Sequence, residues 1–373
     1  MNQNKLLFFH LPHVQKGGLP IIDNRNLRVL KKIFNNVQSI AFNPFESLNK
    51  KNKIVRIIVR ILLLFNINNI YSTKQINITC LKNNNSNSIY FFSHSLFGFL
   101  IEYIKKINPN TFIITFIHNV ESDYKKQIFS NYRTIYNFID WRIVFNAEKR
   151  IAKYSDIILA LNERDSIIFK KSYNTNANII TLPTTLDDRY NEKMKKPINT
   201  QNKLNLLFIG TYFHSNIEGI IWFIENIMPS VNVELHIVGM GMNKLSEKYC
   251  FSNNIHIIGE IDQKTLDSFY YNADIFVSTL FSGGGMKTKI AEAMMFSLPI
   301  IGTNEAFQGY DFDHSLIGIN STEPNKIISF INNVDNNRQL LGTYSAKSRQ
   351  IFLENYSINT SVEKLNKLFE NHK

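Results

Sequence analysis

A glycine-rich turn between an apolar run and an amphipathic segment constrains this chain most. Residues 274–280 (DIFVSTL) have the length and the apolar content of a buried parallel strand. Three glycines follow at 283–285. Apolar residues then recur at helical spacing, at Met286, Ile290, Ala293 and Met294. Because strand, glycine turn and helix follow one another, the stretch predicts a βα unit of an α/β protein.

The same stretch has the composition of a binding site for a diphosphate. The first turn of a helix presents backbone N–H groups without intrahelical partners, and glycines allow an anion to approach them. Lys287 and Lys289 add positive charge there, and Glu292 lies one turn further along, where its carboxylate can accept hydrogen bonds from sugar hydroxyl groups. The residues alone leave a second interpretation open, in which the glycines form only a tight turn and the lysines are solvated.

A longer segment around the turn resembles a known binding signature. Residues 276–303 (FVSTLFSGGGMKTKIAEAMMFSLPIIGT) resemble the donor-binding signature of the retaining GT-B glycosyltransferases of family 4 (glycosyl transferases group 1), in the subgroup with SGGG-x-K-x-K-x-x-E. Family members often carry a glutamate eight residues before the second glutamate; here, as in this subgroup, that position is a glycine, Gly284. The resemblance implies an α/β protein of GT-B fold, with two Rossmann-like domains that face each other across a cleft.

The resemblance also assigns donor-binding roles elsewhere in the second half. Residues 208–229 (FIGTYFHSNIEGIIWFIENIMP) resemble a family segment near which many relatives place an arginine and a lysine that bind the diphosphate. Neither is present here, so we assign the phosphate charge to Lys287 and Lys289, and the ribose to Glu292. Further contacts to the nucleotide sugar are expected from Gly210, His214, Asn216, Gly259, Glu260, Gly283, Gly284, Gly285, Met286 and Thr288.

In the first half, His118 follows directly after a predicted strand at 111–117 (TFIITFI). Ligands collect at the carboxyl ends of parallel strands, and the segment HNVE resembles the H-N-x-E element of the family, whose histidine lies over the donor sugar. We therefore expect His118 to orient the donor sugar; a purely structural histidine is the alternative. Acceptor-side residues are expected at Gly17, Gly18, His94, Asn119 and Glu121, although the two glycines also fit a plain turn between strand and helix.

The charge distribution indicates an anionic partner for the first half. Residues 1–190 carry 26 basic and 12 acidic residues, a net charge of +14, whereas residues 191–373 carry 16 and 18, a net charge of −2. A membrane surface, a lipid diphosphate or a nucleic acid would suit this charge, but no nucleic-acid-binding motif is recognisable. A basic amphipathic helix is predicted at 50–65 (KKNKIVRIIVRILLLF); a membrane-surface role and a core-packing role both fit it.

The polar, aperiodic residues 191–203 predict a linker. We expect an N-terminal acceptor-binding domain at 1–190, a donor-binding domain at 204–350 and a C-terminal helix at 351–373 that packs back on the first domain. The two widely spaced cysteines indicate neither a disulfide nor a zinc site. No apolar run reaches the roughly 20 residues that span a bilayer, and the N-terminal sequence lacks a signal-peptide pattern. The expected location is the cytoplasm, with a peripheral position on the cytoplasmic face of the inner membrane as the membrane alternative.

One further segment carries structural predictions. Residues 122–154 have a helical pattern and predict a long helical region. Glu148, Asp156 and Asp165, in and beside this region, are expected to act as helix caps and salt-bridge partners and not as catalytic groups.

Together these features predict transfer of a sugar, by a hexosyltransferase-type enzyme, from a UDP- or GDP-sugar to a hydroxyl group, with no obligatory metal or cofactor. Charge develops on the departing diphosphate, so preorganised donors there should contribute most. The family retains the anomeric configuration, and no carboxylate pair for a double displacement is evident, which implies a front-face reaction. The family is commonest in bacterial surface polysaccharide synthesis (capsule, O-antigen of lipopolysaccharide, or exopolysaccharide), with a glycan or lipid-linked glycan as acceptor. The alternatives are a non-transferring nucleotide-sugar enzyme of the 2-epimerase type and a non-catalytic sugar-nucleotide-binding protein.

Overall fold

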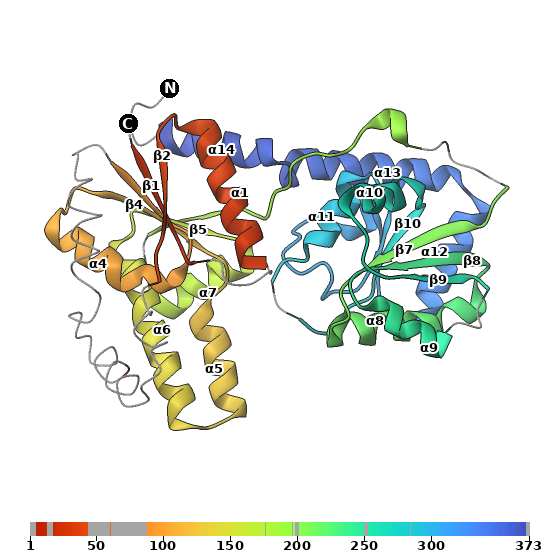
Figure 1. Cartoon of the computed structure of the whole chain (residues 1–373), viewed down its shortest axis with the longest axis horizontal. Helices are drawn as coiled ribbons and strands as arrows, with labels where there is room; N and C mark the ends of the chain where they lie inside the picture. Colours follow the sequence, from red (N-terminus) through yellow and green to blue (C-terminus); the bar gives the residue numbers. More distant parts are fainter. Residues whose placement is uncertain are drawn as a thin grey trace. The chain divides into compact units, whose positions relative to one another are not determined.

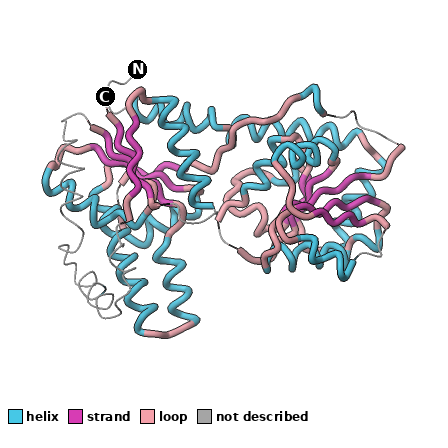
Figure 2. The backbone as a smooth tube through the Cα atoms, viewed as in Figure 1, coloured by secondary structure: helices cyan, strands magenta, loops and turns pink. Residues whose placement is uncertain are grey.

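The computed structural model divides the chain into two compact units. It describes residues 5–12, 18–43, 60, 88–175, 177–195, 197, 201–249, 253–283 and 285–370. Unit 1 comprises Met1–Pro183 and Ser361–Lys373, and unit 2 comprises Thr184–Thr360. Each unit contains a six-stranded sheet with helices packed around it (Figure 2). The predicted α/β architecture with two Rossmann-like domains is therefore confirmed.

Unit 1 is built on short apolar strands. The strand order is β2-β1-β3-β4-β5-β6, and every neighbouring pair is parallel. The strands are β1 (Leu6–His10), β2 (Val37–Ala41), β3 (Ile89–Phe92), β4 (Phe112–Ile117), β5 (Ile157–Ala160) and β6 (Asn178–Thr181). Successive side chains point to opposite faces, so the continuous apolar runs of the central strands fill both faces of the sheet. The direction of strand addition reverses between β1 and β3, and ligands of open parallel sheets collect at the carboxyl ends of such a pair.

Helices surround the sheet of unit 1, and two of them project from it. They are α1 (Gly18–Ile33), the 3-10 turn η2 (Ser95–Phe97), α4 (Gly98–Ile107), α5 (Glu121–Asn131), α6 (Ile135–Tyr154), α7 (Glu163–Tyr173) and most of α14 (Ile358–Glu370). α5 and α6 lie side by side as a hairpin that extends away from the sheet (Figure 1). The helical region predicted at 122–154 is formed by these two helices, with a break between Asn131 and Ile135. Thr134 starts a new helix by accepting the N–H of Asn137 at 3.1 Å, while the Asn137 side chain donates to the Tyr132 carbonyl at 2.8 Å.

The three acidic residues around this hairpin have structural roles, as predicted. The buried Glu148 accepts the two backbone N–H groups in the first turn of α5, at 2.8 and 3.1 Å. Asp156 accepts the backbone N–H of Ile113 at 2.7 Å, and Asp165 accepts the side-chain amide of Asn162 at 2.9 Å. Each carboxylate therefore joins elements of unit 1 or caps a helix.

Unit 2 repeats the architecture with the strand order β12-β11-β10-β7-β8-β9, again all parallel. Its strands are β7 (Leu204–Ile209), β8 (Val233–Val238), β9 (Ile255–Ile258), β10 (Ile275–Ser278), β11 (Ile300–Gly302) and β12 (Gly318–Asn320). Its helices are α8 (His214–Asn226), α9 (Ser246–Tyr249), α10 (Gln263–Asn272), α11 (Thr288–Met295), α12 (Pro324–Asn336) and α13 (Gln339–Ile351), with the short turns η3 (Glu192–Met194), η4 (Met228–Ser230), η5 (Met242–Leu245), η6 (His314–Leu316) and η7 (Phe352–Tyr356). The reversal of strand order here lies between β7 and β10, the strand that leads into the glycine turn.

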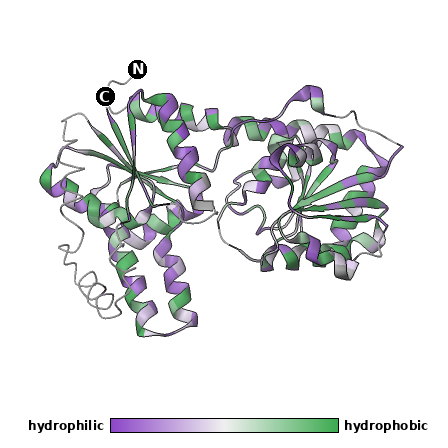
Figure 3. Cartoon of the chain, viewed as in Figure 1, coloured by the Kyte–Doolittle hydropathy of each residue, from purple (hydrophilic) through white to green (hydrophobic). Residues whose placement is uncertain are grey.

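Two apolar clusters on opposite faces of the sheet hold unit 2 together. Along β7, Leu204, Leu206 and Phe208 belong to one cluster, and Leu207 and Ile209 belong to the other. This alternation follows from the two-residue period of a strand. The strands are accordingly mostly apolar (Figure 3). A rigid sheet of this kind fixes the loops at its carboxyl edge, where the candidate site lies.

Some predictions fall largely outside the described residues. The predicted basic helix at 50–65 is described only at Arg60, whose guanidinium pairs with Asp140 at 3.0 Å and lies 4.2 Å from the centre of the Tyr136 ring. Arg60 therefore packs against α6. Among the described residues, we find no helix with the length and hydropathy that crossing a membrane requires.

Candidate functional site

The glycine turn lies at the carboxyl end of β10, beside the strand-order reversal of unit 2. Gly283 has φ +132° and Gly285 has φ +69°, values that side chains rarely adopt. Lys287 is extended (φ −85°, ψ 99°), and α11 begins only at Thr288. The expectation that Met286 belongs to the helix is therefore wrong, because the backbone leaves the glycine turn in an extended conformation. Gly284 lies outside the described residues.

The start of α11 offers unpaired hydrogen-bond donors. The N–H of Ile290 donates to the Lys287 carbonyl at 3.0 Å, and the N–H of Ala291 donates to the Tyr310 hydroxyl at 3.1 Å. The N–H groups of Thr288 and Lys289 have no acceptor within the described part of the chain. Free amides at a helix start favour an anion.

Lys287 is held by a carboxylate that the sequence reasoning missed. Its ammonium donates to Glu305 Oε1 at 2.8 Å and to the Gly285 carbonyl at 2.9 Å. A Cβ on Gly283 would lie 3.6 Å from Lys287 Cε, so the glycine turn packs directly against this ion pair. Glu305 follows β11 in the segment NEAFQGYD, which no charge or spacing pattern links to Lys287. The structure thus places Lys287 in the predicted loop, but paired with a carboxylate.

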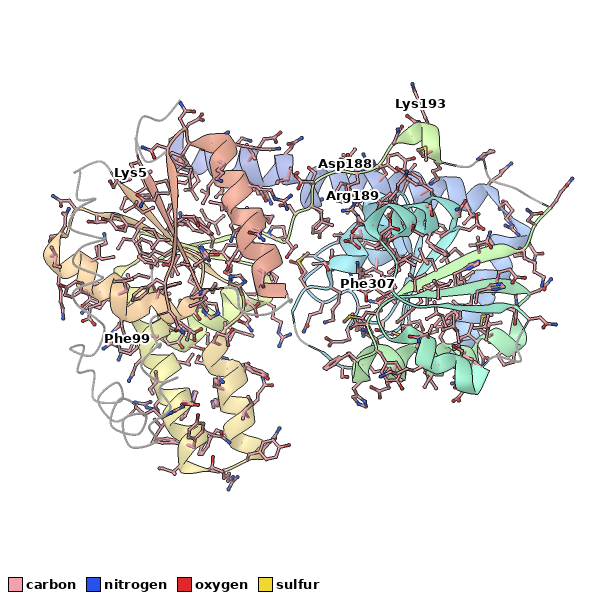
Figure 4. The ribbon with its side chains drawn as sticks, in the orientation of Figure 1. Lys5, Phe99, Asp188, Arg189, Lys193 and Phe307 are labelled. Carbon is pink, nitrogen blue, oxygen red and sulfur yellow. The ribbon has the colours of Figure 1, made fainter. Side chains whose placement is uncertain are left out.

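Lys289 and Glu292 form a second ion pair one turn into α11. Lys289 Nζ donates to Glu292 Oε2 at 2.6 Å, and the Tyr270 hydroxyl donates to the same oxygen at 2.8 Å. Arg189 Nη2 lies 3.9 Å from the other oxygen, Oε1. Arg189, labelled in Figure 4, belongs to the segment that enters unit 2, and it also pairs with Asp267. Glu292 is therefore fixed by its neighbours, and its ribose-binding role stays a prediction.

Two glycines that were not predicted bring the loops of unit 2 together. A Cβ on Gly219, in α8, would lie 1.6 Å from the carbonyl oxygen of Thr279, and a Cβ on Gly239, after β8, would lie 1.8 Å from the carbonyl oxygen of Gly210. The Thr279 hydroxyl donates to the Gly219 carbonyl at 2.9 Å. No side chain fits at either position, so α8 lies directly on the start of the loop after β10. A glycine inside a helical pattern was the sequence signal for Gly219.

The other predicted donor-side residues lie in the first turn of α8 or directly after β7 and β9. Asn216, on α8, donates to the Thr211 carbonyl at 2.9 Å and fills the space above Gly210, where a Cβ would meet its Cγ at 2.9 Å. The His214 side chain is 84% exposed and lies 3.9 Å from Glu218. Gly259 and Glu260 follow β9, the edge strand of the sheet.

A cavity of about 700 Å³ lies at the opposite edge of the same sheet. It is lined by Asn205 near the start of β7, by Asp274 directly before β10, and by His236 of β8. None of the predicted site residues lines it. Since ligands of this architecture collect at the carboxyl ends of the strands, we do not assign the candidate site to this cavity.

In unit 1, His118 stands at the carboxyl end of β4, as predicted. Its Nε2–H donates to the Ser93 carbonyl at 3.0 Å and faces Asp23 Oδ1 at 3.6 Å. The Ser93 hydroxyl in turn donates to Asp23 at 2.5 Å, and the His118 ring packs edge-on against Phe116, with ring centres 5.2 Å apart. Asp23 comes from α1, 95 positions earlier in the chain, and the sequence reasoning missed it.

His94 lies beside His118, with ring centres 5.5 Å apart. Burial and then the nearby His118 lower the pKa of His94 to about 3, so this ring is neutral. Its Nδ1 accepts the N–H of Leu96 at 3.1 Å, which leaves the proton on Nε2, 3.9 Å from Glu121 Oε1. Burial raises the pKa of Glu121. The structure thus brings His94, His118 and Glu121 together, and adds Asp23 to them.

The remaining predicted acceptor-side residues are Asn119, Gly18 and Gly17. Asn119 follows His118, and its Oδ1 is buried without a partner within the described residues. Gly18 is the first residue of α1. Gly17 lies outside the described residues.

Comparison with known proteins identifies similarity in both sequence and fold. Residues 203–320, which span β7 to β12, match the family model described as "Glycosyl transferases group 1". An uncharacterized 44.6 kDa protein in the cps region of Klebsiella pneumoniae is 27% identical over 214 residues, covering 53% of each chain. An uncharacterized glycosyltransferase of Methanocaldococcus jannaschii is 23% identical over 300 residues, covering 75% of this chain and 73% of that one. The chain therefore spans about half the length of the Klebsiella protein.

A solved structure supports the fold across the full length. Anabaena HepE, determined in complex with UDP and glucose, superimposes with a TM-score of 0.65 at 11% identity, covering 99% of this chain and 100% of that one. This chain accordingly has the predicted GT-B fold, and residues 203–320 of its second unit are similar to the glycosyl transferases group 1 family.

Proposed function

We propose that this protein is a retaining glycosyltransferase of the family 4 type, which transfers a sugar from a nucleoside diphosphate sugar to a hydroxyl group. The observation that carries the proposal is the glycine turn after β10. It leads into α11, whose first two amides, at Thr288 and Lys289, have no acceptor among the described residues, and it lies beside the reversal of strand order. The matching family model and the UDP complex of Anabaena HepE support the same assignment.

The site suits stabilisation of the departing diphosphate. The amides of α11 are fixed by the helix, so they need no reorganisation as negative charge develops. Lys287 and Lys289 lie in the same segment, each held by a carboxylate. In the proposed reaction these ammonium groups exchange a carboxylate partner for phosphate oxygens. Loss of one such donor raises a barrier by about 3 kcal/mol in comparable sites.

His118 is proposed to orient the donor sugar. The hydrogen bond to the Ser93 carbonyl holds its ring and places a proton on Nε2, 3.6 Å from Asp23 Oδ1, so Nδ1 of the neutral ring is an acceptor for a hydroxyl group. Asp23 is 1% exposed and already accepts the Ser93 hydroxyl. A carboxylate held in this way is a poor nucleophile for a double displacement, which supports the front-face route to retention.

The setting proposed is bacterial surface polysaccharide synthesis. The Klebsiella relative carries the cps region in its name, and residues 1–190 have a net charge of +14. That charge suits a lipid-linked glycan acceptor, and it suits a peripheral position on the cytoplasmic face of a membrane with anionic lipids. The acceptor-binding role of unit 1 and the donor-binding role of unit 2 belong to the same proposal.

A second candidate is a non-transferring nucleotide-sugar enzyme of the 2-epimerase type. Such an enzyme needs carboxylates near the sugar, and the structure places Asp23 beside His118 and Glu121 beside His94. Incubation with a UDP-sugar and no acceptor separates the two candidates, because only an epimerase yields a new nucleotide sugar. Product NMR with an acceptor present reports the anomeric configuration, and inversion would refute the retaining assignment.

Binding of UDP, GDP, ADP and CMP, measured by calorimetry, tests the donor site. We expect selective binding of one nucleoside diphosphate, weakened at least 10-fold by Lys287→Met. The matched control is Lys203→Met, because Lys203 also pairs with a carboxylate, Glu234 at 3.1 Å, but stands at the start of β7 on the opposite edge of the sheet. Equal affinity of the two variants, or no binding by folded wild-type protein, would refute the donor-site assignment.

A further inference from the structure

Unit 1 contains a group of buried polar atoms without partners. In high-resolution structures nearly all buried polar groups are hydrogen-bonded, so each exception calls for an explanation. Within the described residues of unit 1, the unpartnered side-chain atoms are Nε, Nη1 and Nη2 of Arg25, Oγ of Ser95, Nδ1 of His118 and Oδ1 of Asn119. Ser95 lies in η2, the turn after β3, His118 and Asn119 follow β4, and Arg25 lies on α1. They therefore gather near the carboxyl edge of the sheet, where ligands collect.

Arg25 is the most exceptional member of this group. Its side chain is 1% exposed, and its five N–H donors have no acceptor in the described part of the chain. The guanidinium carbon lies 5.2 Å from the centre of the Phe116 ring, and the His118 ring packs against the same phenyl group at 5.2 Å. The guanidinium and His118 are thus both neighbours of Phe116. Asp23, two residues before Arg25, faces His118 at 3.6 Å.

Within the described residues, no hydrogen-bond acceptor of Arg25 explains its burial. A buried charge without a partner is among the costliest arrangements in a protein. Burial lowers the pKa of Arg25 to about 9, with Asp23 opposing the shift, so the group is still charged at neutral pH. Ring contact with Phe116 offsets part of the cost but satisfies none of the N–H donors. Such a side chain fits a site that is completed by an anionic ligand.

The neighbouring unpartnered atoms describe the rest of that ligand. His118 donates through Nε2, so its Nδ1 is an acceptor, and Asn119 Oδ1 is also an acceptor. A ligand that satisfies all three residues carries an oxyanion for the guanidinium and hydroxyl groups for the two acceptors. A planar guanidinium matches a phosphate or a carboxylate through two parallel hydrogen bonds.

We propose that Arg25 binds the anionic group of an acidic or phosphorylated sugar in unit 1, and that the acceptor substrate carries this group. The inference rests on the proposed function, because it assigns the ligand to the acceptor. Two groups can supply this oxyanion. One is the carboxylate of a uronic acid, and the other is the phosphate of a sugar phosphate. A sugar phosphate group is also present in lipid-linked glycans.

Hydrogen–deuterium exchange of the full chain tests this assignment. The probes are glucuronate, glucose 1-phosphate and, as the neutral control, glucose. We expect one acidic probe to slow exchange in peptides covering α1 (18–33) and residues 112–123, and glucose to have no effect. Protection by glucuronate assigns the carboxylate source, and protection by glucose 1-phosphate assigns the phosphate source. No protection by either probe would overturn the proposal.

Two matched variants separate ligand binding from a structural role. Arg25→Met removes a guanidinium that lies over a phenyl ring and has no hydrogen-bond partner among the described residues. Arg150→Met removes a guanidinium that lies 4.2 Å from the centre of the Phe99 ring and pairs with Glu102 at 2.6 Å. We expect Arg150→Met to lower the melting temperature by several degrees and to keep the protection. Arg25→Met should abolish the protection and leave the melting temperature unchanged or raised, since an unpaired buried charge is removed. A loss of stability equal to that of Arg150→Met would show that Arg25 is structural.

The same experiment keeps this inference distinct from the proposed function. UDP and GDP should protect residues 275–295 in wild type and in Arg25→Met alike. If neither nucleotide protected residues 275–295 of the wild type while an acidic probe still protected α1, the donor site would be refuted and the anion site would be supported. Nucleotide protection without any effect of the acidic probes would refute only the role of Arg25.

Discussion

The contact between Gly219 and Thr279 gives the sharpest test of how unit 2 is assembled. In Gly219→Ala the new Cβ would lie 1.6 Å from the Thr279 carbonyl oxygen, whereas real Cβ contacts essentially never fall below 3.0 Å. The obstacle is backbone and cannot rotate away. α8 must therefore move from the loop after β10 by at least the difference between these two distances.

The loss in the free energy of unfolding can be estimated from the contacts that this movement breaks. Forcing a group into a close-packed region costs about 3 kcal/mol when backbone must shift. The hydrogen bond from the Thr279 hydroxyl to the Gly219 carbonyl, 2.9 Å long, contributes about 1 kcal/mol more. Alanine in place of glycine favours the helix by about 1 kcal/mol and offsets part of this. We expect a net loss in the free energy of unfolding of about 3 kcal/mol.

Gly259→Ala is the matched control, and a native tryptophan is the probe. A Cβ on Gly259 would meet nothing closer than 3.8 Å, so that variant should keep wild-type stability to within about 0.5 kcal/mol. Trp222, on α8, lies edge-on against Phe281 in the loop after β10, with ring centres 5.2 Å apart. In a Trp141→Phe background the emission of Trp222 reports this contact during urea unfolding. Equal midpoints for Gly219→Ala and Gly259→Ala, with unchanged Trp222 emission, would refute the reasoning.

Two further substitutions test one charged group in each unit. Glu305→Gln removes a negative charge beside the proposed diphosphate and so removes a repulsion of about 1 kcal/mol. Calorimetry should therefore show that UDP or GDP binds about five times more tightly. Weaker binding would mean that Glu305 itself contacts the nucleotide sugar. Burial raises the pKa of Glu148 from 4.5 to about 7, so the folded state keeps a proton that the unfolded state releases. Stability from this group is therefore present below pH 4.5 and lost as pH rises towards 7. In urea unfolding, the free energy of unfolding of the wild type should fall by about 3 kcal/mol more over that pH window than that of Glu148→Gln. If the free energies of unfolding of the two proteins changed in parallel with pH, the prediction would be contradicted.

The sequence predicted the parts of the site that depend on local pattern. The buried strand, the glycine turn and the helix at residues 274–295 all carry signals within one short window. The position of His118 at a strand end is equally local, because it needs only the apolar run before it. Both features became site predictions through a general property of parallel sheets, the gathering of ligands at the carboxyl ends of strands.

The parts that sequence reasoning missed depend on contacts between distant residues. Nothing near Lys287 shows that Glu305 will pair with it, because that pairing requires β10 and β11 to lie side by side. Asp23 reaches His118 only because α1 lies beside β3 and β4 at their carboxyl ends. β12 was not predicted, since its three residues are too few to show a period. Arg25 also escaped notice, because an arginine in a helical pattern gives no indication that it will be buried.

The cationic side chains near the two strand-order reversals differ in whether they already have carboxylate partners. This difference affects which interactions contribute the binding free energy of an anionic ligand. In unit 2 the cationic side chains already have carboxylate partners, so an incoming diphosphate replaces one pairing with another. Its net gain should come mainly from the Thr288 and Lys289 amides of α11, which have no acceptor in the part of the chain that the structure describes. In unit 1 Arg25 has no hydrogen-bond partner among the described residues, so an anion there would bind without displacing one of them. Charge on the ligand should therefore influence affinity more strongly at Arg25 than at Lys287 or Lys289, and a neutral acceptor would leave the costliest group of unit 1 unsatisfied.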